Sequence, residues 1–574
     1  MLKLVRYLRG YGLECVLAPL FKCLEALFQL LVPLVMARVV DEGIALADRP
    51  LIWRYALVLV ILGVVGWVSA AVAQYFSAKL AAGFGTAMRD DLFAHVMSLS
   101  RADVDEIGAS TLVTRLTNDA NQIQDGVNIF FRLVLRCPIA VGGTVVACFL
   151  VDGAEGAVFC VVVALVLLLV WRVMRVTVRG YRTVQRNLDG VLRRTAEQIE
   201  GIRVIHAFRR EEAEREDFLV TSKALYERQV GVGDVAAGMN PMTYAVVNLG
   251  LMVVLYVGGV SIDAGTLTQG ALIALANYMI QMQVELMKLT HLVNMISKAS
   301  ACARRVNEVF ARTPSMADGS VDAAGAEPTV EFRDVSFSYP GSTGPALSEV
   351  SFSVSAGQTI GVIGGTGSGK TTLVNLVMRF YDATSGQVLV GGRDVRDYRI
   401  ESLRRLVSIV EQRPRLFAGT IAENLRWGDF DAGDEELLDC VGDAQATDVI
   451  ESKGEGLAAV IEQGGRNLSG GQRQRLSIAR TLARNSRVLI LDDASSALDL
   501  ATDAALRKAL SSRSEGVTTF VVSQRVSALR HADLILVLDG GRLMGCGRHD
   551  ELLRVCGVYR EICESQLEDS EVIR

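Results

Sequence analysis

The chain has 574 residues, of which 50% are hydrophobic, and its formal net charge is -5. The length is enough for several domains, and the apolar composition is typical of a protein that spans a membrane. The modest charge implies no nucleic-acid partner. The 10 scattered cysteines form no close ligand quartet, which indicates reduced residues packed in apolar surroundings.

Long apolar runs dominate the first half of the chain. A helix needs about 20 residues to cross about 30 Å of hydrocarbon, and on this measure the sequence predicts six spans. They lie near residues 16–40, 52–76, 129–151, 156–176, 241–261 and 267–290. Several of these runs continue into polar, still helical stretches, so we expect helices that extend beyond the membrane.

Basic residues are unevenly distributed among the segments that connect the spans. Residues 152–155 and 262–269 contain no Lys or Arg, whereas residues 179–228 are rich in Arg. Because Lys and Arg gather in the cytoplasmic loops of membrane proteins, this distribution predicts that both termini are cytoplasmic.

Polar residues also lie inside the predicted spans. Lys22 and Glu25 are three residues apart in the first span and are expected to pair. In the sixth span Asn277, Gln281 and Glu285 recur every four residues and therefore share one helix face. Because intramembrane acids usually face an aqueous cavity, one interpretation is a substrate-facing stripe that favours cationic amphiphiles. The other is a wetted cavity wall without selectivity, and the sequence leaves both open.

The second half of the chain has a different pattern of polar and apolar residues. Residues 312–329 are small and polar without periodicity, which indicates a linker. Beyond them, short apolar strands alternate with amphipathic helices, a pattern that predicts an α/β domain with a largely parallel sheet. The expected organisation is a membrane domain over residues 1–311, the linker, and an α/β domain over residues 330–574.

A phosphate-binding pattern follows an apolar strand in this second half. The stretch GGTGSGKT fits G-x-x-x-x-G-K-[ST], in which Lys370 is expected to reach the β- and γ-phosphates and Thr371 to bind Mg²⁺. Asp492 ends the apolar strand LILD, where a carboxylate that helps to hold Mg²⁺ is expected. The sequence therefore predicts a site for ATP and Mg²⁺. The residues predicted to surround the phosphates are Gly364, Gly365, Thr366, Gly367, Ser368, Gly369, Lys370, Thr371 and Thr372.

The motif LSGGQ lies between these two elements. With it, the second half resembles the nucleotide-binding domain of an ATP-binding cassette (ABC) protein, and the whole chain resembles an ABC exporter half-transporter. This resemblance implies an all-α six-helix transmembrane domain followed by an α/β P-loop ATPase domain. It extends over essentially the full length, because GASTLVTRLTNDANQI and EGIRVIHAF in the first half also match the exporter family.

The resemblance also implies roles for further residues. Tyr339 matches the aromatic residue that stacks on adenine, and Gln412 matches the glutamine that senses Mg²⁺. Asp499 matches the loop that crosses the dimer interface, and Glu462 matches the acid that touches the partner's coupling helices. In this family two nucleotide-binding domains dimerise head to tail, so LSGGQ contacts the ATP held by the partner. Its residues are Leu468, Ser469, Gly470, Gly471 and Gln472.

Two positions depart from the family pattern. Asp493 stands where the family usually has the Glu that orients or deprotonates the attacking water. Its carboxylate falls about 1.5 Å short, and a misplacement of about 1 Å can cost roughly 100-fold in rate. Gln524 stands where the family usually has a His that contacts the γ-phosphate, and Gln cannot gain a proton near neutral pH. Both departures indicate a site that holds ATP rather than splits it.

The expected assembly is therefore a heterodimer, as in bacterial heterodimeric multidrug-type exporters. The partner is a second, non-identical half-transporter that carries the Glu and the His, and hydrolysis occurs mainly at its site. We expect export of a drug, lipid or peptide across the lipid bilayer of the bacterial inner membrane, with the nucleotide-binding domain in the cytoplasm. The sequence leaves open a slow homodimeric exporter, an importer built on the exporter fold, and an ATP-gated channel or regulatory subunit.

Overall fold

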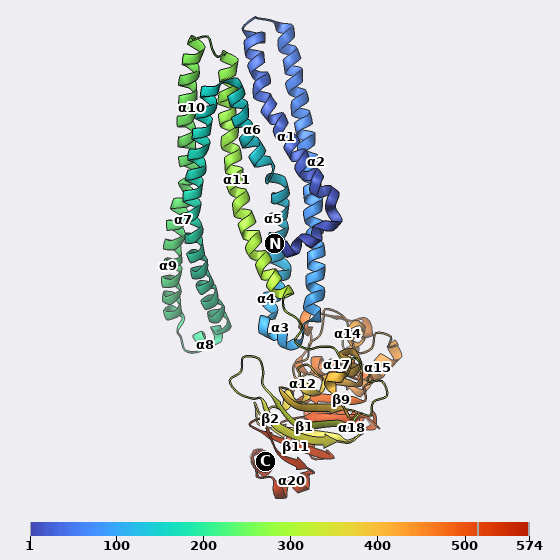
Figure 1. Cartoon of the computed structure of the whole chain (residues 1–574). Coiled ribbons are helices and arrows are strands. Elements are labelled where there is room, and N and C mark those ends of the chain that lie inside the picture. Colours follow the sequence, from blue (N-terminus) through green and yellow to red (C-terminus); the bar gives the residue numbers. More distant parts are fainter. Residues whose placement is uncertain (1, 514–515, 572–574) are drawn as a thin grey trace. The chain divides into compact units, whose positions relative to one another are not determined.

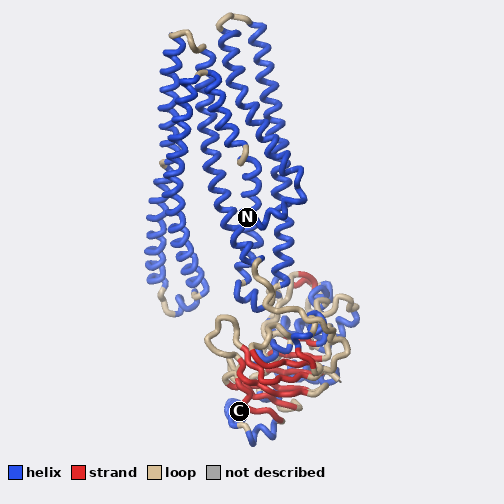
Figure 2. The backbone as a smooth tube through the Cα atoms, in the orientation of Figure 1, coloured by secondary structure: helices blue, strands red, loops and turns tan. Residues whose placement is uncertain are grey.

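A computed structural model describes residues 2–513 and 516–571 of the chain. It divides into two compact units, one formed by residues 1–95 and 110–312 and the other by residues 96–109 and 313–574. The first unit is helical, whereas the second contains the strands (Figure 1, Figure 2). This arrangement confirms the predicted fold class, a helical domain followed by an α/β domain.

The helices of the first unit are long. α2 (Arg49–Ser98) has 50 residues and α7 (Gly153–Glu200) has 48. At 1.5 Å per residue these helices are about 70 Å long, more than twice the thickness of a bilayer core, so they extend well beyond a membrane. The other elements are η1 (Leu2–Tyr11), α1 (Gly12–Arg38), η2 (Val39–Ile44), α4 (Ala109–Thr114), η3 (Arg115–Asp119), α5 (Ala120–Leu133), α6 (Arg136–Val151), α8 (Ile202–Ala207), α9 (Glu211–Ala237), α10 (Met239–Asp263) and α11 (Gln269–Phe310).

Within the described ranges, five helical segments are long and apolar enough to cross a membrane. They are Leu4–Ile44, Arg49–Ser98, Ala109–Val151, Gly153–Glu200 and Glu211–Asp263, and they contain the first five predicted spans. The sixth predicted span lies in α11, which is outside this group; the polar residues Asn277, Gln281, Gln283 and Glu285 lie within that span. The third predicted span, residues 129–151, is not one continuous helix, since α5 ends before α6 begins.

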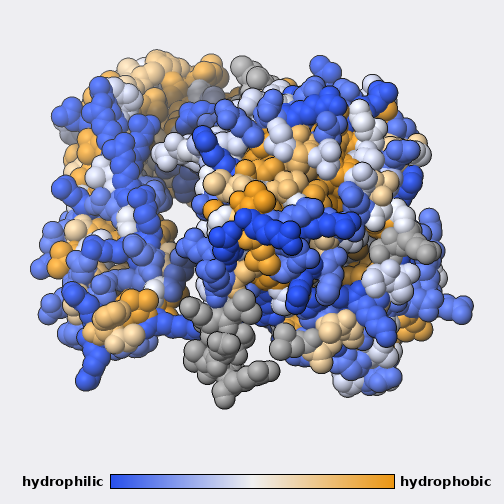
Figure 3. All heavy atoms as spheres, turned by 90° about the horizontal axis from the view of Figure 1, so that it is seen from below, coloured by the Kyte–Doolittle hydropathy of each residue, from blue (hydrophilic) through white to orange (hydrophobic). Residues whose placement is uncertain are grey.

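Small residues allow the helices of this unit to pack closely. α9 and α10 lie along α7, and α11 packs on α1, α5 and α6 (Figure 1). A Cβ atom on Gly126 of α5 would lie 2.3 Å from Cβ of Ala299 on α11. A glycine at such a crossing lets the two backbones approach. Seen from below, the surface is mostly hydrophilic, with hydrophobic patches between the hydrophilic residues (Figure 3).

The second unit is built around a six-stranded sheet in the order β12-β11-β3-β10-β9-β6. All its pairings are parallel except that of β11 with β12. β3 and β9 are buried along almost their whole length, as is typical of parallel strands covered on both faces. A four-stranded antiparallel sheet, β2-β1-β4-β5, and the β7-β8 pair complete the strands.

The bounds of these elements are as follows. The strands are β1 (Val330–Phe337), β2 (Leu347–Val354), β3 (Thr359–Gly364), β4 (Ser385–Val390), β5 (Arg393–Asp394), β6 (Val407–Val410), β7 (Gly419–Thr420), β8 (Val460–Ile461), β9 (Val488–Asp492), β10 (Thr518–Val522), β11 (Leu534–Asp539) and β12 (Arg542–Gly547). The helices are α3 (Arg101–Ile107), α12 (Lys370–Val377), η4 (Val395–Asp397), α13 (Ile400–Leu406), α14 (Ile421–Leu425), α15 (Asp434–Asp443), α16 (Thr447–Glu451), η5 (Gly456–Ala458), η6 (Gln463–Gly465), α17 (Gly470–Ala483), α18 (Leu500–Arg513), α19 (Val526–Leu529), α20 (His549–Val555) and α21 (Gly557–Glu571).

The short helix α3 belongs to the second unit, although the sequence places it in the predicted membrane domain. The hydroxyl of Tyr381 donates to the carboxylate of Asp105 at 2.7 Å, and Arg101 pairs with Glu411 at 3.3 Å. These contacts join residues 96–109 to the α/β unit. The boundary between the two units therefore does not follow a single point in the sequence.

The predicted linker, residues 312–329, is not a free spacer. The backbone N–H of Val321 donates to the carbonyl of Asp397 at 3.0 Å. The guanidinium of Arg379, which is only 2% exposed, donates to the carbonyl of Ala317 at 2.7 Å. The segment is irregular but ordered, because backbone hydrogen bonds and one buried arginine hold it on the α/β unit.

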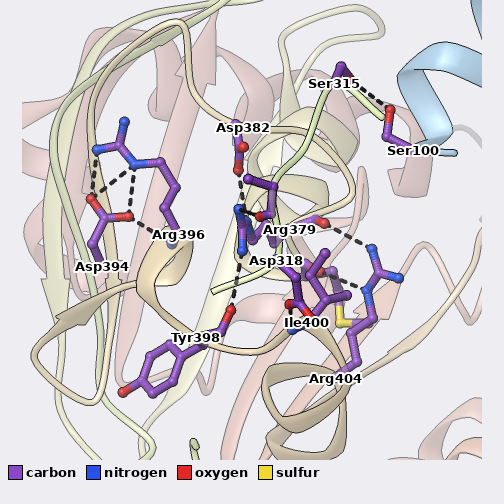
Figure 4. A network of polar contacts seen from close by, with 12 residues as sticks. Ser100, Ser315, Asp318, Arg379, Asp382, Asp394, Arg396, Tyr398, Ile400 and Arg404 are labelled. Atoms are coloured by element: carbon purple, nitrogen blue, oxygen red, sulfur yellow. Dashed lines mark hydrogen bonds and ion pairs between the residues drawn. The ribbon is translucent and has the colours of Figure 1, made fainter. Parts of the chain in front are cut away.

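The linker also contacts α3. The carboxylate of Asp103 accepts hydrogen bonds from the N–H of Ser315 at 3.0 Å and from the hydroxyl of Ser100 at 2.7 Å. The two serine hydroxyls lie 2.7 Å apart (Figure 4). Figure 4 shows Arg379 in the same region of the second unit, so polar contacts hold both α3 and the linker there.

Candidate nucleotide-binding site

The loop between β3 and α12 requires glycine at two positions. Gly364 and Gly369 have φ of 157° and 99°. A Cβ atom would lie 2.1 Å from the carbonyl oxygen of Leu538 at the first position and 2.7 Å from that of Ala346 at the second. The loop can therefore curl between its neighbours only without side chains at these two points.

Three features of this loop fit a triphosphate. Lys370 places Nζ 2.8 and 2.7 Å from the carbonyl oxygens of Gly364 and Gly365, on the inner side of the loop. The hydroxyl of Ser368 is buried and has no partner among the described residues. α12 begins at Lys370, so its N-terminus provides further N–H groups for an anion. Burial lowers the pKa of Lys370, a shift that Asp493 and Asp492 oppose.

Two oxygen atoms beside the loop fit Mg²⁺. The Thr371 hydroxyl donates to Oδ1 of Asp492 at 3.2 Å, at the carboxyl end of β9. Burial raises the pKa of Asp492 to about 6, against the hydrogen bond from Thr371. Mg²⁺ is usually held by one or two protein oxygens together with phosphates and waters. The pair therefore provides the kind of donor set that this ion takes.

Asp493 lies next to this pair in a fixed orientation. Its backbone has φ of 51°, a left-handed conformation that Asp adopts more readily than most residues. Its N–H donates to the carbonyl of Val522 at 3.0 Å. Its carboxylate accepts a hydrogen bond from Nε2 of Gln412 at 3.2 Å. Neighbouring strands and the glutamine therefore determine where this carboxylate lies.

One pocket of about 300 Å³ brings most of the predicted nucleotide residues together. It is lined by Tyr339, Ala346, Thr366, Gly367, Ser368, Gly369, Lys370, Thr371, Thr372, Gln412, Asp492, Asp493, Val522, Ser523 and Gln524. Three of these residues, Ala346, Val522 and Ser523, are not predicted from the sequence. No motif marks Ala346, whereas Val522 and Ser523 immediately precede Gln524, so they can be found by extending that motif towards the N-terminus.

Tyr339 forms part of the pocket wall. Its hydroxyl lies 3.1 Å from that of Thr372, and its ring makes edge contacts with Phe337 and Tyr381 at centroid distances of 4.8 and 5.2 Å. The ring is half-buried. It is therefore held in place while part of its surface stays available for stacking on a planar base.

The LSGGQ residues lie outside this pocket. Ser469 caps α17, with the N–H of Gln472 donating to its hydroxyl at 3.2 Å. Ser469 and Gly470 are exposed, whereas Leu468 is buried and Gly471 is half-buried. The N-terminus of this 14-residue helix, which carries a positive partial charge, therefore lies at the surface.

The two predicted interface residues are also exposed. The carboxylate of Asp499 accepts hydrogen bonds from the N–H and the hydroxyl of Thr502 at 2.9 and 2.8 Å. Glu462 precedes the LSGGQ loop, and its side chain points to solvent. Both residues are thus accessible to a second chain.

In the polar stripe predicted in the sixth span, the acidic residue Glu285 is buried and ion-paired. Glu285 is 6% exposed and accepts two hydrogen bonds from Arg136, at 2.8 and 2.7 Å, and one from Lys288 at 2.8 Å. Asn277 donates to the carbonyl of Ile273 in its own helix at 3.0 Å. Glu285 is therefore paired with two cations, and a substrate-facing role for Asn277, Gln281 and Glu285 stays a prediction.

The same charged group continues into α1. Arg136 donates to Gln29 at 2.8 Å and lies 3.7 Å from Glu25. Glu25 accepts from Lys22 at 2.6 Å, which confirms the predicted pair. These contacts join α1, α6 and α11 through buried ion pairs.

Helical segments long and apolar enough to cross a membrane, in one chain with an α/β unit that carries a phosphate loop, are the architecture of an ATP-binding membrane transporter. Residues 15–286 match the family described as ABC transporter transmembrane region, and residues 347–496 match that described as ABC transporter. The chain is 35% identical to an uncharacterized ABC transporter ATP-binding protein of Mycobacterium tuberculosis, over 99% of this chain and 98% of that one. The chain belongs to the ABC transporter family and is a half-transporter of the exporter architecture, with an ABC ATPase domain.

Two further comparisons extend the resemblance. An ATP-dependent lipid A-core flippase of Vibrio vulnificus is 30% identical, over 91% of this chain and 90% of that one. A bacterial Atm1-family ABC exporter solved with ATP bound superposes with a TM-score of 0.81 at 24% identity, over 97% of this chain and 98% of that one. At this identity, the similarity to the Atm1-family exporter shows a shared fold.

Proposed function

We propose that this chain is one half of an ATP-driven exporter whose own nucleotide site binds ATP and Mg²⁺ but seldom hydrolyses ATP. The observation that carries the proposal is that Asp493 and Gln524 line the same pocket as Lys370 and Thr371. The groups that bind the nucleotide are present, and the two substituted positions are those expected to act on the γ-phosphate and the attacking water.

A second chain is needed to complete each site. LSGGQ lies outside the pocket that contains the phosphate loop, and its helix end is exposed. A head-to-tail pair would place this motif on the ATP of the partner. We propose that the partner is a non-identical half-transporter with Glu and His at the two substituted positions, so that this chain contributes Ser469 and Gly470 to a competent site.

The cargo that we propose is an amphiphile of the drug or lipid class, moved outward. The similarity to a lipid A-core flippase supports a lipid-like cargo. The loops at residues 152–155 and 262–269, which lack Lys and Arg, support an orientation with the nucleotide-binding domain in the cytoplasm. In a bacterial cell this corresponds to the inner membrane.

The experiment that tests the pairing uses an affinity tag on this chain. The transporter is purified from its native cells, and mass spectrometry identifies every half-transporter that copurifies. We expect a second chain with Glu at the position of Asp493 and His at the position of Gln524. Recovery of this chain alone, together with loss of turnover in Asp493→Asn, would instead establish a slow homodimer.

Further measurements test where ATP is hydrolysed and in which direction the cargo moves. Replacing the partner's Glu with Gln is expected to abolish most turnover, whereas turnover that persists near the normal rate overturns the degenerate-site proposal. ATP-dependent uptake of a labelled amphiphile into inverted vesicles indicates export, and uptake into right-side-out vesicles indicates import. Ion conductance under ATP without stoichiometric turnover would indicate a channel.

A further inference from the structure

Glu155 is a buried carboxylate without a partner in the membrane unit. It lies in the first turn of α7, and its side chain is 0% exposed. Neither of its carboxylate oxygens has a hydrogen-bond partner in the described part of the chain. The burial exists within one chain, so it does not depend on a second half-transporter.

The surroundings of this carboxylate are apolar and closely packed. A Cβ atom on Gly258 of α10 would lie 3.2 Å from Oε1 of Glu155 and 2.4 Å from Leu272 of α11. The absence of a side chain at Gly258 therefore leaves the space beside the acid. Leu267, in the loop before α11, lies 3.5 Å from the same point.

No basic group described in the structure is paired with this acid. Asp152, in the loop before α7, is the charged residue that acts on it, and its own carboxylate caps the N–H groups of Ala154 and Glu155. α6 contributes the thiol of Cys148. On α11, Tyr278 interacts with Cys148, and its hydroxyl donates to the carbonyl of Leu30. α10 faces the acid with Gly258.

The magnitudes favour a neutral acid in this conformation. An ionised carboxylate that is buried without a partner carries a large desolvation cost, even after relaxation of the protein. The N-terminus of α7 stabilises an anion by less than this cost, and the like charge of Asp152 opposes it. Carrying a proton removes the larger cost.

We propose that Glu155 is a proton-binding site that is closed in this conformation and opens when α10 and α11 move away from α7. Water then reaches the carboxyl group and allows the proton to leave. Proton binding favours the closed arrangement, because a ligand shifts an equilibrium toward the state that binds it better. One linked proton changes the ratio of open to closed molecules by up to about tenfold per pH unit.

The protonation state is tested on the full-length transporter, purified through a tag on this chain and reconstituted in liposomes. A protonated-carboxyl infrared band is expected at neutral pH in the wild type and is expected to be lost in Glu155→Gln. Asp263→Asn, which alters an exposed acid at the end of α10, is the matched control and is expected to keep the band. An identical band in the wild type and Glu155→Gln overturns the proposal.

The coupling to conformation is tested by hydrogen exchange of residues 148–160 and 255–272, corrected for the intrinsic effect of pH. In the wild type the opening equilibrium is expected to rise by up to about tenfold per pH unit over the titration range, whereas Glu155→Gln is expected to respond little. An equal response in both proteins overturns the coupling. If Glu155→Gln does not fold, Glu155→Asp is used instead. It keeps a titratable group and is expected to shift the infrared band, and an unshifted band likewise counts against the site.

Discussion

Gln412 donates a hydrogen bond from Nε2 to Oδ2 of Asp493, at 3.2 Å. The two residues are 81 positions apart in the sequence and come from the motif expected to sense Mg²⁺ and from the position expected to carry the catalytic base. The left-handed backbone of Asp493 and its hydrogen bond to Val522 fix the direction of the side chain. Side-chain length therefore decides how far the carboxylate reaches.

The first prediction concerns this reach. Asp493→Glu adds one methylene, and combined with Gln524→His it is expected to raise ATP turnover at this site by roughly 10- to 100-fold, the cost associated with a misplacement of about 1 Å. Steady-state ATPase is measured on the reconstituted transporter, with the partner's Glu replaced by Gln so that the partner site is silent.

The control for this gain is Lys370→Ala added to the same variant. Lys370 lies inside the phosphate loop of this chain, so its loss is expected to remove the gained turnover. A gain that survives Lys370→Ala would show that the activity comes from another site. No gain in the double variant would contradict the assignment of these two positions.

The second prediction concerns the LSGGQ motif. A Cβ atom at Gly470 meets no atom within 4 Å, so Gly470→Ala is expected to leave the thermal stability of this chain unchanged. Turnover is nevertheless expected to fall by at least about tenfold, because the added methyl group would face the ATP of the partner. Gly442→Ala, in α15 and equally free of contacts, is the matched control and is expected to leave both quantities unchanged. Normal turnover in Gly470→Ala would argue against a contact in trans.

The nucleotide motifs could be predicted from the sequence because their chemistry depends on local spacing. A loop such as GGTGSGKT needs glycines at fixed positions, and the pocket brings together the end of β9, the loop and Gln524 as expected. The helical membrane unit is likewise predictable from the length of its apolar runs. In both cases the physical requirement lies within a short stretch of chain.

Pairings between distant residues could not be predicted in this way. Arg136 and Glu285 are 149 positions apart, and nothing local indicates that each neutralises the other. Arg379 follows α12 closely in the sequence, and only the fold shows that it is buried against the linker. Both contacts depend on packing between segments, which hydrophobic periodicity does not encode.

The third prediction concerns the linker. Arg379→Ala removes a buried guanidinium that bonds Asp382 and the carbonyl of Ala317, and leaves both groups without their partner. We expect a loss of about 3–5 kcal/mol in the stability of the α/β unit, as for other broken buried ion pairs. Thermal unfolding measures the loss, and limited proteolysis is expected to show faster cleavage within residues 313–322.

The control is Arg396→Ala, which breaks the pair with Asp394 at the edge of the same region (Figure 4). The Arg396 side chain is 43% exposed and that of Asp394 is 11% exposed. Asp394 keeps a hydrogen bond from the backbone N–H of position 396 after the substitution, so this variant is expected to lose clearly less stability than Arg379→Ala does. Equal destabilisation by the two substitutions would contradict a special role for Arg379.

The fourth prediction separates structure from substrate recognition in the membrane unit. Glu285→Ala leaves Arg136 buried without its main partner and is expected to destabilise the transporter by about 3–5 kcal/mol, as measured by thermal unfolding in detergent. Asn277→Ala removes a hydrogen bond within one helix and is expected to cost about 1 kcal/mol or less. The double variant Glu285→Ala with Arg136→Met is expected to recover part of the stability, because it also removes the orphaned charge. If Glu285→Ala keeps wild-type stability and loses only amphiphile-stimulated ATPase, Glu285 instead acts on the substrate.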